Sequence, residues 1–139
     1  MEWSCFVIIK LMNILRNIGA GFVAIVIGVV LAYATDYVCV AAGLFPADNL
    51  RVAWWIILFV VLYRSIYTTL GCYVAAKLAP RNAMALVLTL GIVGFVVTLL
   101  GGIVTWNQNL APHWYCIMLA ILAIPSSWFG GVLAMKKRT

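Results

Sequence analysis

Long runs of apolar residues, separated by short polar stretches, organise this chain. Four of these runs contain the roughly 20 residues that a helix needs to cross the hydrocarbon core of a bilayer. Proline and polar residues interrupt the pattern near Pro46, near Pro80 and over Asn107–Pro112. The pattern predicts an all-α, polytopic membrane protein with four transmembrane helices, over about residues 17–40, 53–76, 83–105 and 113–135.

The first 16 residues precede the first span and are also mostly apolar. Lys10, Asn13 and Arg16 recur in them at helical spacing. This segment therefore either forms a short helix in the cytoplasmic interface of the membrane or extends the first span downward. The apolar stretch Ile18–Ala34 is longer than the core of a signal peptide, which has about 7–15 residues, so a cleaved signal peptide is not expected.

The composition and charge narrow the class of protein. Hydrophobic residues make up 67% of the chain and charged residues 9%, whereas a soluble chain averages about 25% charged residues. These values exclude a soluble domain, a disordered chain and a coiled coil. The net charge of +6 is dispersed between the apolar runs, as membrane topology alone produces, so no nucleic-acid partner is expected.

The positions of the basic residues predict the orientation. Seven of the nine Lys and Arg fall at one end of the predicted bundle, and Arg51 falls at the other. Because Lys and Arg accumulate in cytoplasmic loops, both termini are expected in the cytoplasm, and the basic tail 136–139 can attract anionic lipid headgroups. An aromatic belt is expected at the opposite interface, from Trp54, Trp55, Trp106, Trp114 and Tyr115.

Each predicted span carries small residues at steps of three or four, so that they share one face. Lipid tails are as apolar as leucine, so membrane helices associate where small residues let their backbones approach. These faces predict one bundle, and they can also supply contacts between subunits. The residues expected in helix packing are Ala24, Gly28, Gly71, Gly94, Gly101 and Gly130.

Pro125 lies near the middle of the predicted fourth span. Its ring removes a backbone hydrogen bond and kinks the helix, and the hydroxyls of Ser126 and Ser127 are placed to satisfy the freed carbonyl. The kink is interpreted as a packing feature or, alternatively, as a hinge or gate.

Arg64 lies near the middle of the predicted second span. On insertion scales an arginine at this depth costs about 2.5–3.5 kcal/mol, so it normally faces the bundle interior and has a partner. Asp36 lies at a similar depth in the first span, which predicts an ion pair with Arg64. This pair either locks the first helical hairpin, lines a site for an anion or polar solute, or bridges two subunits. Hydroxyl groups surround the pair in the sequence, at Tyr33, Thr35, Tyr37, Tyr63, Ser65, Tyr67, Thr68 and Thr69.

Residues for conventional catalysis are scarce. The four cysteines have no paired spacing, so they are expected to pack as small apolar residues, and neither a metal nor a cofactor is expected. The single histidine, His113, is expected in a hydrogen-bonding role at the outer interface. The sequence contains no phosphate loop, no carboxylate pair and no H-E-x-x-H motif.

Several short motifs resemble a family of small bacterial four-helix integral membrane proteins to which no activity is assigned. The likeness covers about residues 12–135, and it implies a bacterial inner membrane protein. The motifs are Thr35-Asp36 with Phe45-Pro46, Tyr63-Arg64 through Gly71-Cys72-Tyr73 to Leu78-Ala79-Pro80, Pro112-His113-Trp114-Tyr115, and Pro125 through Trp128-Phe129-Gly130-Gly131.

Together these features favour a non-catalytic, oligomer-forming structural or accessory subunit. Its expected partners are membrane lipids and either a second copy of the chain or another membrane protein. The alternative is a channel or transporter for an anion or small polar solute that uses Arg64 paired with Asp36. An intramembrane enzyme is the second alternative.

Overall fold

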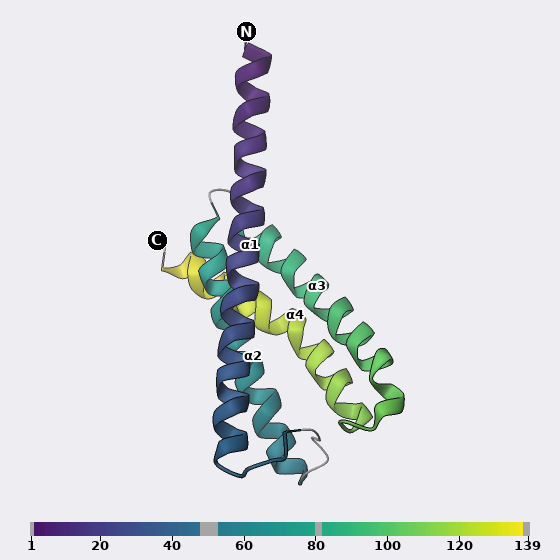
Figure 1. The fold of residues 1–139 in the computed structure, drawn as a ribbon. Coiled ribbons are helices and arrows are strands. Elements are labelled where there is room, and N and C mark those ends of the chain that lie inside the picture. The colour runs from purple at the N-terminus through teal and green to yellow at the C-terminus, as the bar shows by residue number, and fades with distance from the viewer. Residues whose placement is uncertain (1, 48–52, 80–81, 138–139) are drawn as a thin grey trace.

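The computed structural model describes residues 2–47, 53–79 and 82–137. Within them the chain forms four α-helices and one short 3-10 helix, and it contains no strand. Each α-helix is long and apolar enough to cross a membrane, which confirms the all-α fold class and the four candidate spans. The helices are α1 (Glu2–Ala41), α2 (Trp54–Leu78), α3 (Ala83–Val104), η1 (Trp106–Gln108) and α4 (His113–Lys136) (Figure 1).

The first helix extends far beyond the part expected to cross the membrane. α1 has 40 residues, so it is about 60 Å long, or about twice the thickness of the hydrocarbon core. Its N-terminal part projects past the other three helices (Figure 1). The large apolar side chains there are exposed, Trp3 at 84% and Phe6 at 65%. The segment before residue 17 is therefore continuous with the first span and is not a separate helix.

The helices are arranged as two hairpins. α1 pairs with α2, α3 pairs with α4, and α2 also packs along α4. α1 and α3 touch over a short stretch near Gly21, where an added Cβ would lie 3.4 Å from a methyl group of Leu90. From there the hairpins diverge towards the end of the molecule that carries residues 42–47 and 105–112 (Figure 1). This divergence leaves α1 and α3 as the two walls of an open cleft.

Two clusters of buried side chains hold the helices together. The cluster near the diverging end joins α1, α2 and the start of α4 through larger side chains. The other cluster joins α2, α3 and α4, mostly through alanines, which let the backbones approach. The first cluster contains Cys39, Phe45, Ile57, Val60, Val61, Tyr63 and Tyr115, and the second contains Cys72, Ala76, Ala79, Ala83, Val87 and Ala134.

Half of the small residues expected in helix contacts lie in tight contacts within the chain. A Cβ added to Gly71 would lie 2.9 Å from the carbonyl oxygen of Ala24, and Ala24 itself is buried. A Cβ added to Gly130 would lie 2.5 Å from the carbonyl oxygen of Thr69. These two glycines therefore set the closest approach of α2 to α1 and to α4.

The other half have open space beside them. A Cβ added to Gly28 or to Gly101 would meet no atom within 4 Å, and one added to Gly94 would meet only the Cβ of Ala123, at 3.9 Å. The contacts of Gly28, Gly94 and Gly101 within the chain do not require glycine. These positions are thus available for contacts outside the chain.

Helix α4 continues through Pro125. The carbonyl freed by this proline is that of Ile121, four residues earlier. Ser127 donates its hydroxyl hydrogen bond to the carbonyl of Ile124 instead, at 2.7 Å, and its fully buried side chain packs against Gly91. The expectation that Ser127 satisfies the freed carbonyl is therefore wrong, because the rotamer of Ser127 is fixed by its contact with α3.

Candidate functional site

An ion pair joins α1 to α2. The guanidinium of Arg64 donates from Nη2 to Oδ2 of Asp36 at 2.6 Å. The hydroxyl of Tyr63 donates to the other carboxylate oxygen, Oδ1. The structure thus brings together the two residues expected to pair, and it adds Tyr63 as a second donor. Both oxygens of Asp36 are therefore bonded by adjacent residues of α2.

A second polar contact between the same helices lies one turn away. The hydroxyls of Thr35 and Tyr67 are 2.7 Å apart. The ring of Tyr67 lies 5.7 Å from that of Tyr63, measured between centroids. The two polar contacts and the adjacent rings fix the rotation of α1 about its axis against α2.

Two other residues expected at the site stay outside this network. Tyr33 is 74% exposed, and Thr68 donates its hydroxyl hydrogen bond to the carbonyl of Arg64 in its own helix, at 3.0 Å. At this level α1 has diverged from α3 (Figure 1), so only part of its surface, which includes Asp36, is shielded by α2. Tyr33 lies off that strip.

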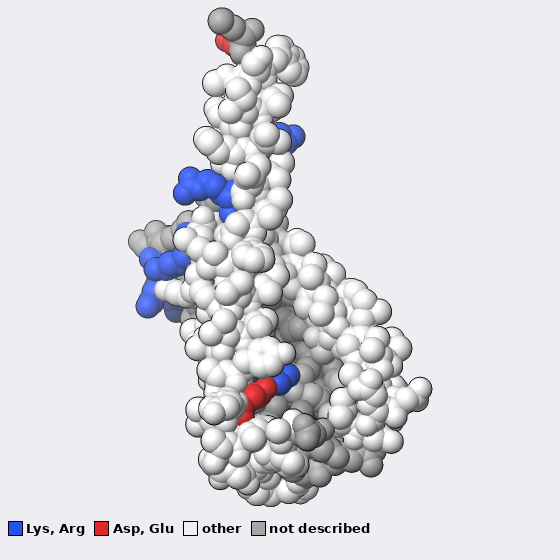
Figure 2. Space-filling model, viewed as in Figure 1, with Lys and Arg blue, Asp and Glu red and all other residues white. Residues whose placement is uncertain are grey.

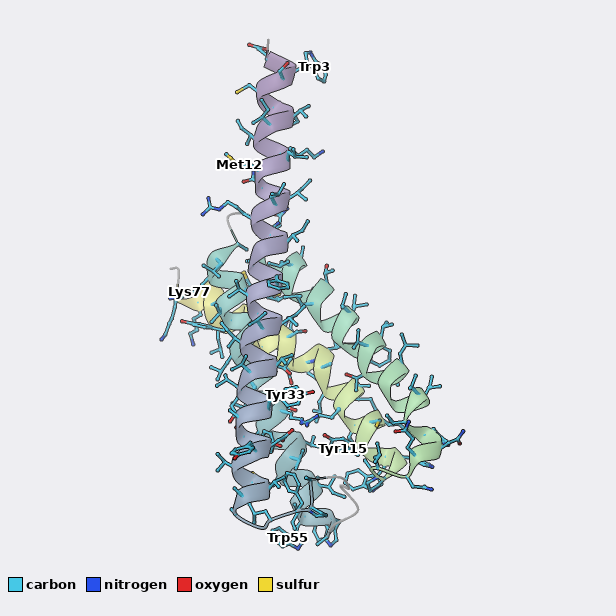
Figure 3. All side chains as sticks on the ribbon, viewed as in Figure 1. Trp3, Met12, Tyr33, Trp55, Lys77 and Tyr115 are labelled. Carbon is cyan, nitrogen blue, oxygen red and sulfur yellow. The ribbon has the colours of Figure 1, made fainter. Side chains whose placement is uncertain are left out.

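Tyr115 lies close to the site and is buried, which differs from the position that the sequence predicts for it. It was expected in an exposed aromatic belt, and the four tryptophans of that belt are 39–69% exposed. Tyr115 is instead 5% exposed and packs in the first cluster, between α2 and the start of α4 (Figure 3). Its hydroxyl is buried and has no hydrogen-bond partner among the described residues. Its position at the third residue of α4 turns it towards α2.

An open cleft lies beside the ion pair, between the two hairpins. Its wider part has a volume of about 430 Å³ and is lined by residues of all four helices. A second part of about 320 Å³ shares seven of its lining residues and continues along α1 and α3. Figure 2 shows this hollow, with the blue and red atoms of the ion pair at its edge. We call it the α1–α3 cleft. It is lined chiefly by Ala24, Gly28, Val29 and Ala32 of α1, Arg64, Tyr67, Thr68 and Gly71 of α2, Leu90, Gly94, Val97 and Thr98 of α3, and Ala123 and Ser126 of α4.

The lining is apolar apart from Arg64 and a few hydroxyls. The side chain of Arg64 is 33% exposed, and its Nε is buried and forms no hydrogen bond with any described residue. Because Asp36 balances the charge of Arg64, the cleft carries no excess charge from this pair. Such a cleft suits an apolar occupant with a single polar acceptor at the level of Arg64.

The remaining candidate groups lie apart from the ion pair. The ring of His113 stacks on that of Trp106, with centroids 3.9 Å apart, and this contact joins η1 to the start of α4. The four cysteines are free thiols, of which Cys39 and Cys72 are buried. In the part of the chain that the structure describes, no three His, Cys, Asp or Glu side chains gather closely enough to hold a metal ion.

The evidence for function is therefore the geometry of the ion pair and of the α1–α3 cleft. The resemblance to small bacterial four-helix membrane proteins rests on the sequence motifs alone. No protein-family profile, curated protein or solved structure matches this chain.

Proposed function

We propose that this protein is a non-catalytic, oligomer-forming membrane subunit whose α1–α3 cleft binds a transmembrane helix of a neighbouring subunit. The observation that carries the proposal is the open space beside glycines on both walls of the cleft. Gly28 on α1 has no atom within 4 Å of an added Cβ, and Gly94 on α3 has one, at 3.9 Å.

The chemistry of the cleft supports a helix as its occupant. Membrane helices gain stability where small residues allow close backbone contact, because lipid tails already solvate larger apolar side chains. Gly28 and Ala32 on one wall, with Gly94 on the other, offer such a surface along the cleft. The partly exposed guanidinium of Arg64, which lines the cleft, can donate to a hydroxyl or carbonyl oxygen of the incoming helix.

The ion pair supports this role by holding one wall in place. α1 has little contact with α3, so its position depends on α2. The bonds from Arg64 and Tyr63 to Asp36 tie the two helices together near the cleft. The pair is therefore proposed to fix the shape of the cleft and to take no part in catalysis.

The charge distribution supports an orientation with both termini in the cytoplasm. The basic side chains gather at the end of the bundle where α2 ends and α3 begins (Figure 2). Apart from Arg64, the described basic side chains are Lys10 in the projecting part of α1 and Arg16, Lys77, Lys136 and Lys137 at this end, whereas Arg51, Arg81 and Arg138 lie outside the described residues. Under the positive-inside rule this end is proposed to face the cytoplasm.

Filling the cleft tests the proposal. Gly28→Leu and Gly94→Leu should leave the monomer folded, since both positions have room, and should lower the oligomeric mass of the purified protein in lipid nanodiscs. Gly19→Leu and Gly101→Leu are matched controls on the same two helices, because they also have open space but do not line the cleft. Equal masses for cleft variants and controls would refute the proposal.

A second candidate function is the passage of an anion or small polar solute along the cleft. The partial exposure of the Arg64 side chain in the cleft favours it. If this function holds, Arg64→Ala should abolish anion flux into liposomes while the oligomeric mass stays unchanged. Absence of flux from the wild-type protein would rule this candidate out.

A further inference from the structure

The projecting part of α1 presents an apolar surface that no other described element covers. The helices α2, α3 and α4 have 22–25 residues, enough for one crossing of the hydrocarbon core. α1 continues past the level at which they end (Figure 1). In a bilayer that holds all four spans, its first residues therefore reach beyond the hydrocarbon core. A large apolar surface that is exposed there marks an interaction site.

An exposed apolar seam runs along α1 from the projecting part into the α1–α3 cleft. Its residues recur at steps of three or four, so they share one face of the helix over about 33 Å. Each of them is 47–67% exposed, and the last two line the cleft. We call this surface the α1 seam, and it consists of Val7, Leu11, Ile14, Ile18, Phe22, Ile25 and Val29.

The polar side chains of the projecting part lie off the α1 seam. Lys10, Asn13 and Arg16 follow one another at steps of three and therefore occupy a different side of the helix. Met12 also lies off the seam and projects from the side of α1 away from α3 (Figure 3). The seam is thus the side of this segment that can face a second helix while the polar side chains stay in contact with water.

The continuity of the seam with the cleft restricts which helix can lie along both. Such a helix must enter the cleft and must also extend beyond the level at which α2, α3 and α4 end. Copies of one membrane protein share their orientation and depth, so these three helices of a second copy would leave the projecting part uncovered. α1 of a second copy has the required length, 40 residues, and it carries the same apolar seam.

We propose that the helix bound in the α1–α3 cleft is α1 of a second copy of this chain, parallel to the first and packed against it along the α1 seam. This inference rests on the proposed function of the cleft and names its partner. A two-fold axis along the membrane normal places the two seams against each other, because the same surface then serves both copies. Each α1 is in this way a wall of one cleft and the occupant of the other.

Disulfide cross-linking between copies in membranes tests this pairing. Leu11→Cys, Ile14→Cys and Ile25→Cys each introduce one cysteine on the seam, in a full-length chain whose four native cysteines are replaced by alanine. Each introduced cysteine faces its own counterpart across the two-fold axis, so oxidation with copper phenanthroline should yield covalent dimers.

Ile9→Cys and Met12→Cys are the matched controls in the projecting part of α1. Both positions are exposed, at 50% and 58%, but they lie on the far sides of the paired helices. With helix axes about 8–10 Å apart, their Cα atoms are separated by more than the roughly 7 Å that a disulfide can bridge. The yield of covalent dimer at the seam positions should therefore be several-fold higher than at the controls.

The other outcomes separate this inference from the proposed function. Equal yields at seam and control positions would indicate random collisions and would overturn the pairing. Cross-linking at residues 11 and 14 but not at residue 25 would overturn it as well, because the two helices would then part before the cleft. Absence of seam cross-links, while Gly28→Leu still lowers the oligomeric mass, would overturn the identity of the partner and leave the proposed function standing. Seam cross-links with a mass that Gly28→Leu leaves unchanged would refute the proposed function and, with it, the place of α1 in the cleft.

Discussion

Replacing Asp36 by Asn removes the charge that Arg64 faces while keeping the size of the side chain. The amide oxygen can still accept from Arg64, so the substitution isolates the electrostatic part of the contact. The result should be a less stable protein, because the guanidinium then lies in the bundle without a counter-charge.

The structure bounds the size of this effect. An arginine without a partner costs about 2.5–3.5 kcal/mol at the bilayer centre. The side chains of Arg64 and Asp36 keep 33% and 25% of their exposure, so screening reduces the loss. We expect about 1–2 kcal/mol for Asp36→Asn. For a chain of this size that corresponds to a fall of about 3–6 °C in the melting temperature.

Thermal unfolding in detergent, followed by tryptophan fluorescence, measures this fall. A double-mutant cycle with Arg64→Gln separates the pair from its surroundings. The double variant should be more stable than the sum of the single losses predicts, with a coupling energy of about 1 kcal/mol. Lys10→Gln, in the projecting part of α1, is the control and should melt like the wild type. An unchanged melting temperature for Asp36→Asn, or strict additivity in the cycle, would refute the assignment of a stabilising ion pair.

Two further predictions concern the contacts around α2. Gly130→Ala should destabilise the protein by about 2–4 kcal/mol, because the added Cβ would lie 2.5 Å from a carbonyl oxygen of α2. Gly28→Ala is the comparison, since its added Cβ would have no atom within 4 Å, and it should change the melting temperature by less than about 1 °C. If both alanine variants melt alike, the tight α2–α4 contact is wrong. Tyr63→Phe should lower the melting temperature more than Tyr67→Phe, because Tyr63 donates to the carboxylate of Asp36 and Tyr67 contacts a neutral hydroxyl. The opposite order would contradict the hydrogen-bond assignments.

The four spans could be predicted because span length and apolarity are properties of each segment alone. The ion pair could be predicted for a related reason, since a charge in the middle of a span needs a partner at the same depth. Asp36 is the acidic residue of the first span, so the choice of partner for Arg64 was narrow. The sequence indicates only weakly that the first helix continues through Arg16. The indication is that neither Gly nor Pro occurs before Gly19, so nothing in the sequence interrupts a helix there.

The arrangement of side chains around the pair depended on helix packing, which the sequence does not give. Tyr33 and Tyr63 are equally plausible partners by sequence, but only Tyr63 faces Asp36. Tyr115 reads as an interfacial aromatic residue, and it is buried because the start of α4 packs against α2. The roles of Gly28 and Gly71 likewise differ only because α1 stays with α2 and diverges from α3. These differences arise because the two hairpins touch near Gly21 and diverge beyond it.

The most direct measurement asks whether a helix occupies the α1–α3 cleft in a bilayer. Val29 lines the cleft and Val30 does not, although both side chains are exposed, at 47% and 59%. Each would carry a nitroxide label on a cysteine, with the four native cysteines replaced by alanine, and collisions with lipid-dissolved oxygen would be recorded at increasing protein-to-lipid ratios. The label at residue 29 should lose oxygen accessibility as the ratio rises, while that at residue 30 stays constant. Accessibility at residue 29 that is independent of the ratio would mean that lipid fills the cleft, and would contradict the proposed role.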